Sequence, residues 1–175
     1  SNVLIDRAGH VRIVDFGLAR VEEAAPVTQT GVILGTITYM APEALTGNPH
    51  VVDARSDVYS LGAVLYELLA FRPPFVSTSL TNLIDEIHRG DVPSLARLHP
   101  GLSRDVQLCA GKCLAKEREL RYATAQDLAE DLRRWLEGLP VRARPVSPAR
   151  RVRYWARRHP VHALLASMAL VAFLA

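Results

Sequence analysis

The residues of this chain that could do chemistry lie near its start. Asn2 offers an amide oxygen and Asp15 a carboxylate, and Asp15 opens the triplet Asp15-Phe16-Gly17. Oxygen donors of these two kinds suit Mg²⁺, a hard cation that proteins bind through carboxylates and substrate phosphates. Two donors are a weak signal alone, so their meaning depends on the elements that position them.

A hairpin and a long loop surround these two residues. Val3-Leu4-Ile5 and residues 11–14 are short β-rich runs, and the residues between them include Gly9 in a turn-forming cluster. This pattern predicts a β-hairpin that leads directly into Asp15. Residues 18–40 show no sustained period and are rich in Pro, Thr, Gln and Gly, so we expect a loop there. Long loops in compact domains are usually functional or mobile.

The rest of the chain up to Gly138 has helical patterns. The strongest pattern begins at Ser56-Asp57 and predicts a central, buried helix that ends before Arg72-Pro73-Pro74. Its expected apolar stripe consists of Val58, Leu61, Leu65 and Leu68, widened by Val64 and Leu69. Three later helices are predicted: one around Leu83, Ile84 and Ile87 that closes near Gly90, one capped by Ser103, and one with a capping box from Thr124 to Asp127 that stops at Gly138.

Composition indicates a globular protein with a basic tail. Hydrophobic residues make up 49% of the 175 residues and charged residues 22%. The net charge of +3 hides an asymmetry, because no acid follows Leu139 while the preceding part has more acids than bases. We therefore do not interpret the basic pI as nucleic-acid binding by the domain. The arginines of the tail are Arg142, Arg144, Arg150, Arg151, Arg153, Arg157 and Arg158.

The two cysteines do not predict a metal site. Cys109 and Cys113 lie four residues apart in a helical pattern, which places them on one helix face. A zinc site needs further ligands at a matching spacing, and the sequence has no second pair. We expect buried, reduced core cysteines.

Ordered motifs along the chain resemble a known family. The chain looks like the C-terminal lobe of a eukaryotic-like Ser/Thr protein kinase of the bacterial transmembrane type, over residues 1–138. This resemblance implies a mainly α fold with a β-hairpin, an activation loop and a helical bundle. The blocks that carry it are Ser1-Asn2-Val3-Leu4-Ile5-Asp6, Asp15-Phe16-Gly17-Leu18-Ala19-Arg20, Gly35-Thr36, Tyr39-Met40-Ala41-Pro42-Glu43, Ser56-Asp57-Val58-Tyr59-Ser60-Leu61-Gly62 and Arg121.

The resemblance implies roles for the residues near the start. Asn2 and Asp15 match the two Mg²⁺ ligands, with Asp15 reaching the phosphates of ATP through the metal. Phe16 and Gly17 complete the motif of Asp15, and the orientation of Phe16 separates active from inactive states. Thr36 matches the threonine that faces the substrate hydroxyl, and its presence with Tyr39 favours Ser/Thr over Tyr specificity.

Structural roles are implied further along. Asp57 matches a buried aspartate that holds the catalytic-loop backbone, while Glu43 and Arg121 match a buried ion pair. Taken singly, these residues have plainer interpretations: Asp57 as a first-turn acid favoured by the helix dipole, Arg121 as a solvated arginine, and Phe16 as a core residue. Thr28 and Thr30 match the region of autophosphorylation in similar bacterial kinases, and ordinary polar loop residues are the alternative.

The chain also departs from the family pattern. Ala70-Phe71 stands where a small residue or glycine is usual, and residues 116–121 lack a proline often found in that turn. A kinase also needs a Gly-rich loop, a strand lysine, its glutamate partner and a catalytic-loop aspartate, all of which would precede Asn2. We therefore expect a piece of a longer protein, and no kinase activity from these residues alone.

The tail predicts a membrane segment. Residues 161–175 are almost wholly apolar, whereas spanning a bilayer takes about 20 residues. Pro160 suits a first helical turn, and Tyr154 and Trp155 suit an interfacial belt beside arginines on the cytoplasmic side. We expect a basic juxtamembrane linker over 139–160 and a truncated transmembrane helix over 161–175. A C-terminal helix packed on the domain is the alternative.

The sequence thus predicts part of a membrane-linked Ser/Thr kinase. The complete protein would use ATP and Mg²⁺ to phosphorylate Ser or Thr of protein substrates, with its lobe in the cytoplasm, one helix in the membrane and no nucleic-acid partner. The alternative is a non-catalytic interaction module tethered at the membrane. An intact catalytic-loop His-Arg-Asp and strand lysine upstream would favour the enzyme.

Overall fold

The computed structural model describes residues 3–13, 35–143, 156 and 160–174. The chain divides into two compact units, residues 1–30 and residues 31–175, which we describe separately. Asn2, Asp15, Phe16, Gly17, Thr28 and Thr30 lie outside the described residues.

The first unit contains the predicted β-hairpin. Strands β1 (Val3–Ile5) and β2 (Val11–Ile13) pair antiparallel, with Leu4 opposite Arg12. The Asp6 carboxylate accepts hydrogen bonds from the backbone amides of Ala8 (3.0 Å) and His10 (2.9 Å), which closes the turn. Gly9 adopts a φ of 84°, which glycine reaches without steric cost.

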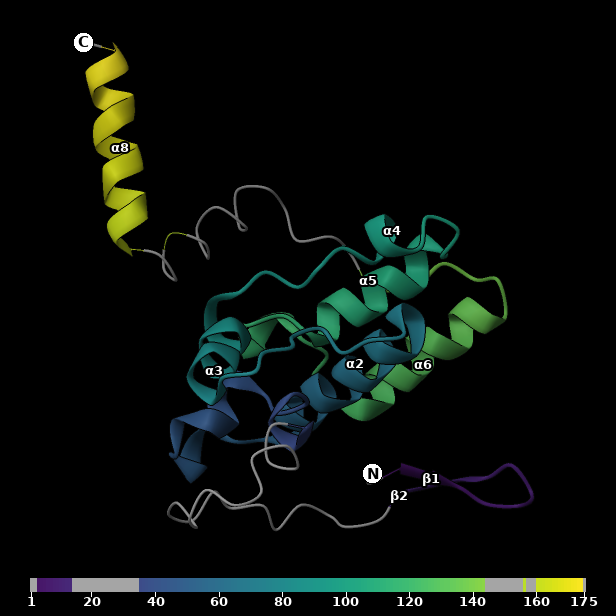
Figure 1. Ribbon diagram of the computed structural model, residues 1–175. Coiled ribbons are helices and arrows are strands. Elements are labelled where there is room, and N and C mark those ends of the chain that lie inside the picture. Colours follow the sequence, from purple (N-terminus) through teal and green to yellow (C-terminus); the bar gives the residue numbers. More distant parts are fainter. Residues whose placement is uncertain (1–2, 14–34, 144–155, 157–159, 175) are drawn as a thin grey trace. The chain divides into compact units, whose positions relative to one another are not determined.

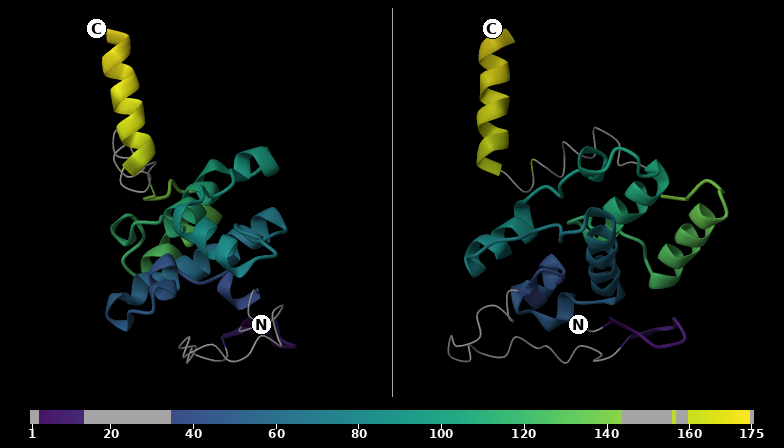
Figure 2. Two further views of the ribbon diagram at one scale, coloured as in Figure 1. Left: turned by 60° about the vertical axis from the view of Figure 1, so that its left-hand side comes forward. Right: turned by 45° about the vertical axis from the view of Figure 1, so that its right-hand side comes forward.

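Helix α2 (Ala54–Ala70) is the central element of the second unit. It packs against α4 (Leu95–Leu98), α5 (Arg104–Cys113) and α6 (Ala125–Leu136), as Figures 1 and 2 show. The helix begins slightly earlier than predicted, because Asp53 caps it by accepting a hydrogen bond from the Arg55 amide (2.9 Å). It ends as predicted before the prolines, where Phe71 takes a left-handed φ of 56°.

The apolar stripe predicted for α2 is wrong in part. Leu61 and Leu68 are 36% and 69% exposed, although Val58 of the same stripe is fully buried. The buried face instead consists mainly of small and aromatic residues: Ser56, Val58, Tyr59, Gly62, Ala63, Tyr66 and Ala70. Small residues occupy this face because α5 approaches closely there. A Cβ at Gly62 would collide with the Cβ of Cys113.

The later helices follow their predicted signals. Helix α3 (Leu80–Arg89) buries Leu83 and Ile87 and is followed by Gly90. Ser103 caps α5 by accepting from the Asp105 amide, and Thr124 and Asp127 form the predicted capping box of α6. Short elements that the sequence did not predict are α4 and the 3₁₀ helices η1 (Pro42–Thr46), η2 (Pro49–Val51) and η3 (Arg118–Leu120). Residues 35–37 are also helical, within the segment predicted as loop.

Both cysteines lie in the core, as predicted. Cys109 and Cys113 are fully buried, form no disulfide, and pack with Val58, Tyr122 and Leu128. Burial raises the pKa of both thiols, that of Cys113 to about 12, so they stay protonated and unreactive at neutral pH.

A buried carboxylate holds the segment after α6 against the lobe. Asp131 accepts hydrogen bonds from the Tyr122 hydroxyl (2.8 Å) and from the backbone amides of Arg142 (2.7 Å) and Ala143 (2.8 Å). Ala143 is itself buried beside Val58. These bonds fix the backbone of residues 142 and 143 to α6, five residues past Gly138.

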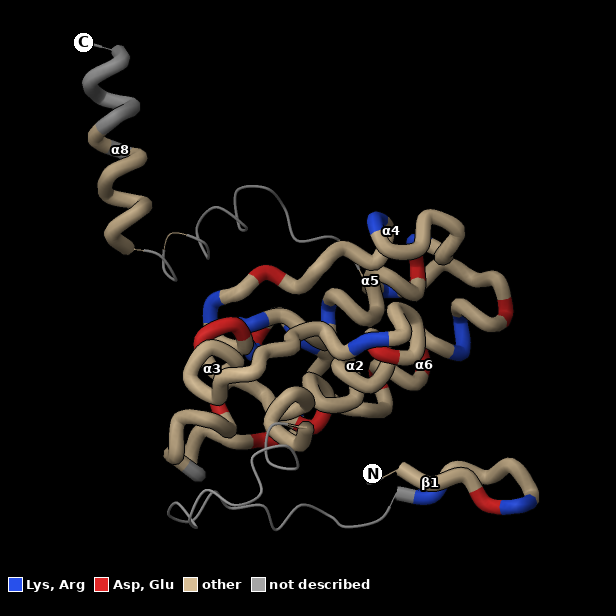
Figure 3. Tube along the Cα trace, in the orientation of Figure 1, with Lys and Arg blue, Asp and Glu red and all other residues tan. Residues whose placement is uncertain are grey.

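Helix α8 (Pro160–Leu174) covers most of the apolar tail. It has 15 residues, and its sequence carries no Lys, Arg, Asp or Glu. The coloured part of α8 in Figure 3 shows neither blue nor red. Val161, Leu164, Leu165 and Met168 are exposed. Among the residues that the structure describes, no helix is long and apolar enough to cross a membrane.

The close contact between α2 and α5 makes a first prediction. Gly62→Ala should destabilise the protein by about 1–3 kcal/mol, because the added methyl group meets Cys113 in a packed core. Gly111→Ala is the matched control, since a Cβ there meets nothing within 4 Å. This control should be neutral or stabilising by up to about 1 kcal/mol, as expected from helix propensity. Denaturant unfolding measures both, and equal effects would contradict the packing.

Candidate functional site

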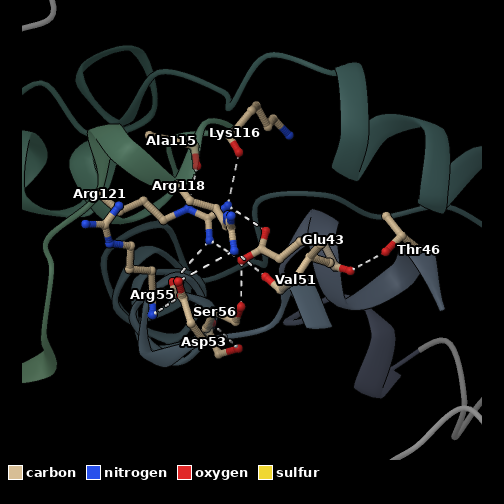
Figure 4. Close-up of polar contacts among 11 residues, drawn as sticks. Glu43, Thr46, Val51, Asp53, Arg55, Ser56, Ala115, Lys116, Arg118 and Arg121 are labelled. Atoms are coloured by element: carbon tan, nitrogen blue, oxygen red, sulfur yellow. Dashed lines mark hydrogen bonds and ion pairs between the residues drawn. The ribbon is translucent and has the colours of Figure 1, made fainter. Parts of the chain in front are cut away.

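The candidate site depends on a buried guanidinium group, that of Arg121. Its Nη1 and Nη2 donate to the two carboxylate oxygens of Glu43 at 2.7 and 2.9 Å (Figure 4). The Arg121 side chain is 0% exposed and the Glu43 side chain 9%. The ion pair predicted from the sequence is therefore confirmed, and the alternative of a solvated arginine is wrong.

Every N–H donor of this guanidinium has a partner. Besides Glu43, Arg121 donates to the backbone oxygens of Arg55 (3.1 Å), Ala115 (2.7 Å) and Lys116 (3.1 Å). An arginine has five such donors in a planar fork, and five acceptors surround this one. Its cationic face also lies over the Tyr59 ring, 4.9 Å from the centroid. Arg121 thus joins η1, α2 and the turn before η3.

The surroundings of the Glu43 carboxylate favour its ionised form. Burial opposes ionisation of Glu43, but hydrogen bonds from Arg121 and from the Ser56 hydroxyl (2.6 Å) outweigh it, so the pKa of the carboxyl is lowered. Because the pKa of Glu43 is lower in the folded state than in the unfolded chain, the ionised carboxylate stabilises the protein at pH values above the unfolded pKa of about 4.3. This contribution is lost as the pH falls through the lowered pKa.

The segment before Glu43 is held by α2 and α3. The Tyr39 hydroxyl donates to Glu67 of α2 at 2.6 Å. Burial and this bond raise the pKa of Tyr39 to about 12, so the phenol keeps its proton at neutral pH. Ile37 is buried with Phe75 and with Leu83 of α3. Thr36, which precedes Ile37, is exposed and lies in the helical turn 35–37.

The role that the resemblance implies for Asp57 stays a prediction. Asp57 lies in the first turn of α2, where it is exposed rather than buried. The catalytic-loop backbone that it was expected to hold would precede Asn2 and is not among the described residues. Its position fits the alternative interpretation, an acid placed favourably at the positive end of a helix dipole.

The structure brings together some of the predicted site residues. Glu43 and Arg121 are in contact, Thr36 lies in the helical turn 35–37, and Asp57 lies in α2 next to Ser56. Sequence reasoning missed Ser56 and Tyr39 as polar contacts of the site. Both lie inside the motif blocks, so the sequence identified their positions but not the residues to which they donate hydrogen bonds. Within the described part of the chain, no group of His, Cys, Asp and Glu residues could hold a metal ion.

Comparison with known proteins identifies the family. The sequence matches the protein kinase domain over residues 1–132, a stretch that includes the hairpin, Glu43, α2 and Arg121. The chain belongs to the protein kinase domain family. It is a partial kinase domain, and its mainly helical fold is the one that the resemblance implied.

Similar proteins are serine/threonine kinases by name. Serine/threonine-protein kinase PknB of Mycobacterium leprae is 41% identical over 144 residues, which cover 82% of this chain and 23% of that protein. PknB of Mycobacterium tuberculosis is 43% identical over 146 residues, with the same coverage. PknB of Mycolicibacterium smegmatis is 39% identical over 140 residues, covering 79% of this chain and 22% of that protein. The chain spans less than a quarter of the length of these relatives.

The buried pair in this kinase domain makes a second prediction. Arg121→Ala should cost about 3–5 kcal/mol in the free energy of unfolding, because it leaves the Glu43 carboxylate buried without its partner. Arg89→Ala is the control, since Arg89 makes an exposed contact with Asp85 (3.4 Å) and should lose at most about 1 kcal/mol. Thermal or denaturant melts compare the two. Similar losses would contradict the role of the pair.

Proposed function

We propose that the protein containing this chain transfers the γ-phosphate of ATP to Ser or Thr hydroxyls of other proteins. The family match and the names of the relatives support this activity over a non-catalytic interaction module. One observation carries the proposal: the buried Glu43–Arg121 pair fixes the end of the segment that begins at Asp15 and contains Thr36. A residue that faces the substrate must be held in a defined position, and fixing the end of its segment helps to position Thr36.

Asn2 and Asp15 are the residues proposed to hold Mg²⁺. Their amide and carboxylate oxygens are the donors that this hard cation prefers, and only Asp15 brings formal charge. The bound metal would neutralise charge on the phosphates of ATP. Thr36 is proposed to face the hydroxyl of the protein substrate, while Phe16 and Gly17 complete the motif around Asp15. Thr28 and Thr30 are proposed phosphorylation sites, where a phosphate adds up to about two negative charges.

We also propose a membrane attachment at the C-terminal end. Residues 139–160 would link the lobe, residues 1–138, to an apolar segment at 161–175. The uncharged, exposed surface of α8 and the seven arginines before it support this proposal. Arginines on one side of an apolar helix favour the cytoplasm for that side. The kinase lobe would then be cytoplasmic, on a protein that crosses the membrane once.

The proposed metal ligand makes a third prediction. In the complete kinase, Asp15→Asn should abolish phosphoryl transfer while leaving the fold intact, because an amide cannot supply the charge that the carboxylate gives to Mg²⁺. Asp85→Asn, at an exposed site on α3, is the control and should keep wild-type turnover. Phosphate incorporation into a Ser/Thr peptide and a thermal melt measure both effects. Wild-type turnover of the Asp15 variant would refute the proposed role.

The apolar tail makes a fourth prediction. The complete protein should stay with the membrane pellet after alkaline carbonate extraction. Ala166→Arg should weaken this attachment, because an arginine near the middle of an apolar segment costs about 2.5–3.5 kcal/mol on insertion scales. Ala166→Leu keeps the segment apolar and serves as the control. Recovery of the wild-type protein in the soluble fraction would overturn the membrane assignment.

A further inference from the structure

The turn at η3 presents a second arginine, Arg118, to the same stretch of chain that Arg121 holds. Arg118 Nη1 donates to the backbone oxygen of Val51, the last residue of η2, and lies 3.5 Å from Oδ2 of Asp53, which caps α2. Figure 4 shows both arginines reaching from one side toward this stretch. Together they contact residues 43, 51, 53 and 55, which span the connection from η1 to α2.

Among the described residues, the other hydrogen bonds found at positions 46–51 of this connection are local. The Asn48 amide donates to Thr46 (3.4 Å), the His50 amide to the Asn48 side chain (3.1 Å), and the Val51 amide to the Asn48 carbonyl (3.3 Å). Such bonds shape a turn but do not fix it to the rest of the domain. The contact from Arg118 comes from a residue 67 positions away and supplies that fixation.

The plainer interpretation is a surface arginine of little consequence. The Arg118 side chain is 33% exposed, and the Asp53 side chain 50%, so the ion pair alone contributes little to stability. The bond to the Val51 carbonyl is different, because it is charge-assisted and joins two segments far apart in sequence.

We infer that Arg118 is a positioning residue, which with Arg121 clamps residues 43–55 and thereby sets how the kinase binds its protein substrate. The effect would pass through η1, which contacts η2 on one side and α3 on the other. Leu45 of η1 packs on the cluster that buries Ile37, the residue next to Thr36. This inference rests on the proposed function, because Thr36 is the proposed contact with the substrate hydroxyl.

Steady-state kinetics of the complete kinase test the inference. Arg118→Ala should raise the KM for a Ser/Thr peptide about three- to tenfold, the loss expected for one charge-assisted hydrogen bond at a partly exposed site. The KM for ATP and kcat should stay within about twofold. Arg118→Lys should restore most of the peptide KM, since an ammonium group can still donate to Val51. Arg104→Ala, an exposed arginine of α5, is the matched control and should change nothing. An unchanged peptide KM for Arg118→Ala would overturn the inference.

Hydrogen–deuterium exchange separates the clamp from the proposed activity. Arg118→Ala should speed exchange in peptides that cover residues 48–53, whereas Arg104→Ala should not. Asp53→Asn keeps the cap on α2, because asparagine caps as well as aspartate, and should give a smaller increase. Unchanged exchange in Arg118→Ala would refute the clamp, whether or not the kinase is active. Faster exchange with an unchanged peptide KM would refute its link to the substrate. No turnover by the wild-type kinase would count against the proposed function, and exchange would still decide the clamp.

Discussion

The buried guanidinium of Arg121 is the interaction on which the rest of the lobe depends. It brings three stretches of chain that are far apart in sequence to one point: Glu43 of η1, the Arg55 carbonyl of α2, and the turn at residues 115–116. A buried charge is tolerated only when it is paired and fully hydrogen-bonded. Moving any of these three stretches away would leave the guanidinium without one of its partners and would raise the free energy of the folded protein. The polar centre of the lobe is thereby fully hydrogen-bonded around Arg121, although turns supply several of the acceptors.

The second constraint is the close approach of α2 to α5. Gly62 lets the backbone of α2 come against Cys113. Both cysteines in turn pack with Tyr122, which follows η3, and with Leu128 of α6. The same approach presents Tyr59 to Arg121, so apolar packing and the ion pair fix the same face of α2. This mutual support explains why a helix with two exposed leucines can still be the centre of the domain.

Features set by neighbouring residues could be predicted from the sequence, and features set by distant partners mostly could not. Ser103 and Thr124 cap helices through bonds to residues two or three positions away, so local chemistry identified them. The Glu43–Arg121 pair was found only because motif order identified both residues. Periodicity placed Leu61 and Leu68 on a helix but could not tell which face α5 would cover. The contacts of Arg118 and Tyr39 cross the fold, and those of Asp131 reach residues 9 to 12 positions away. The residues next to each of them in the sequence do not indicate these partners.

The hydrogen bonds that Asp131 accepts from the amides of Arg142 and Ala143 decide where the tether of the lobe begins. Counted from Ala143, the chain reaches Pro160 over at most roughly 60 Å when fully extended. With α8 in a bilayer as proposed, this length limits how far the lobe moves from the membrane. It would also set the local concentration of the lobe at the membrane surface, which falls as a tether lengthens. Releasing these two amides would lengthen the tether and dilute the kinase at the surface, without any change near Asp15 or Thr36.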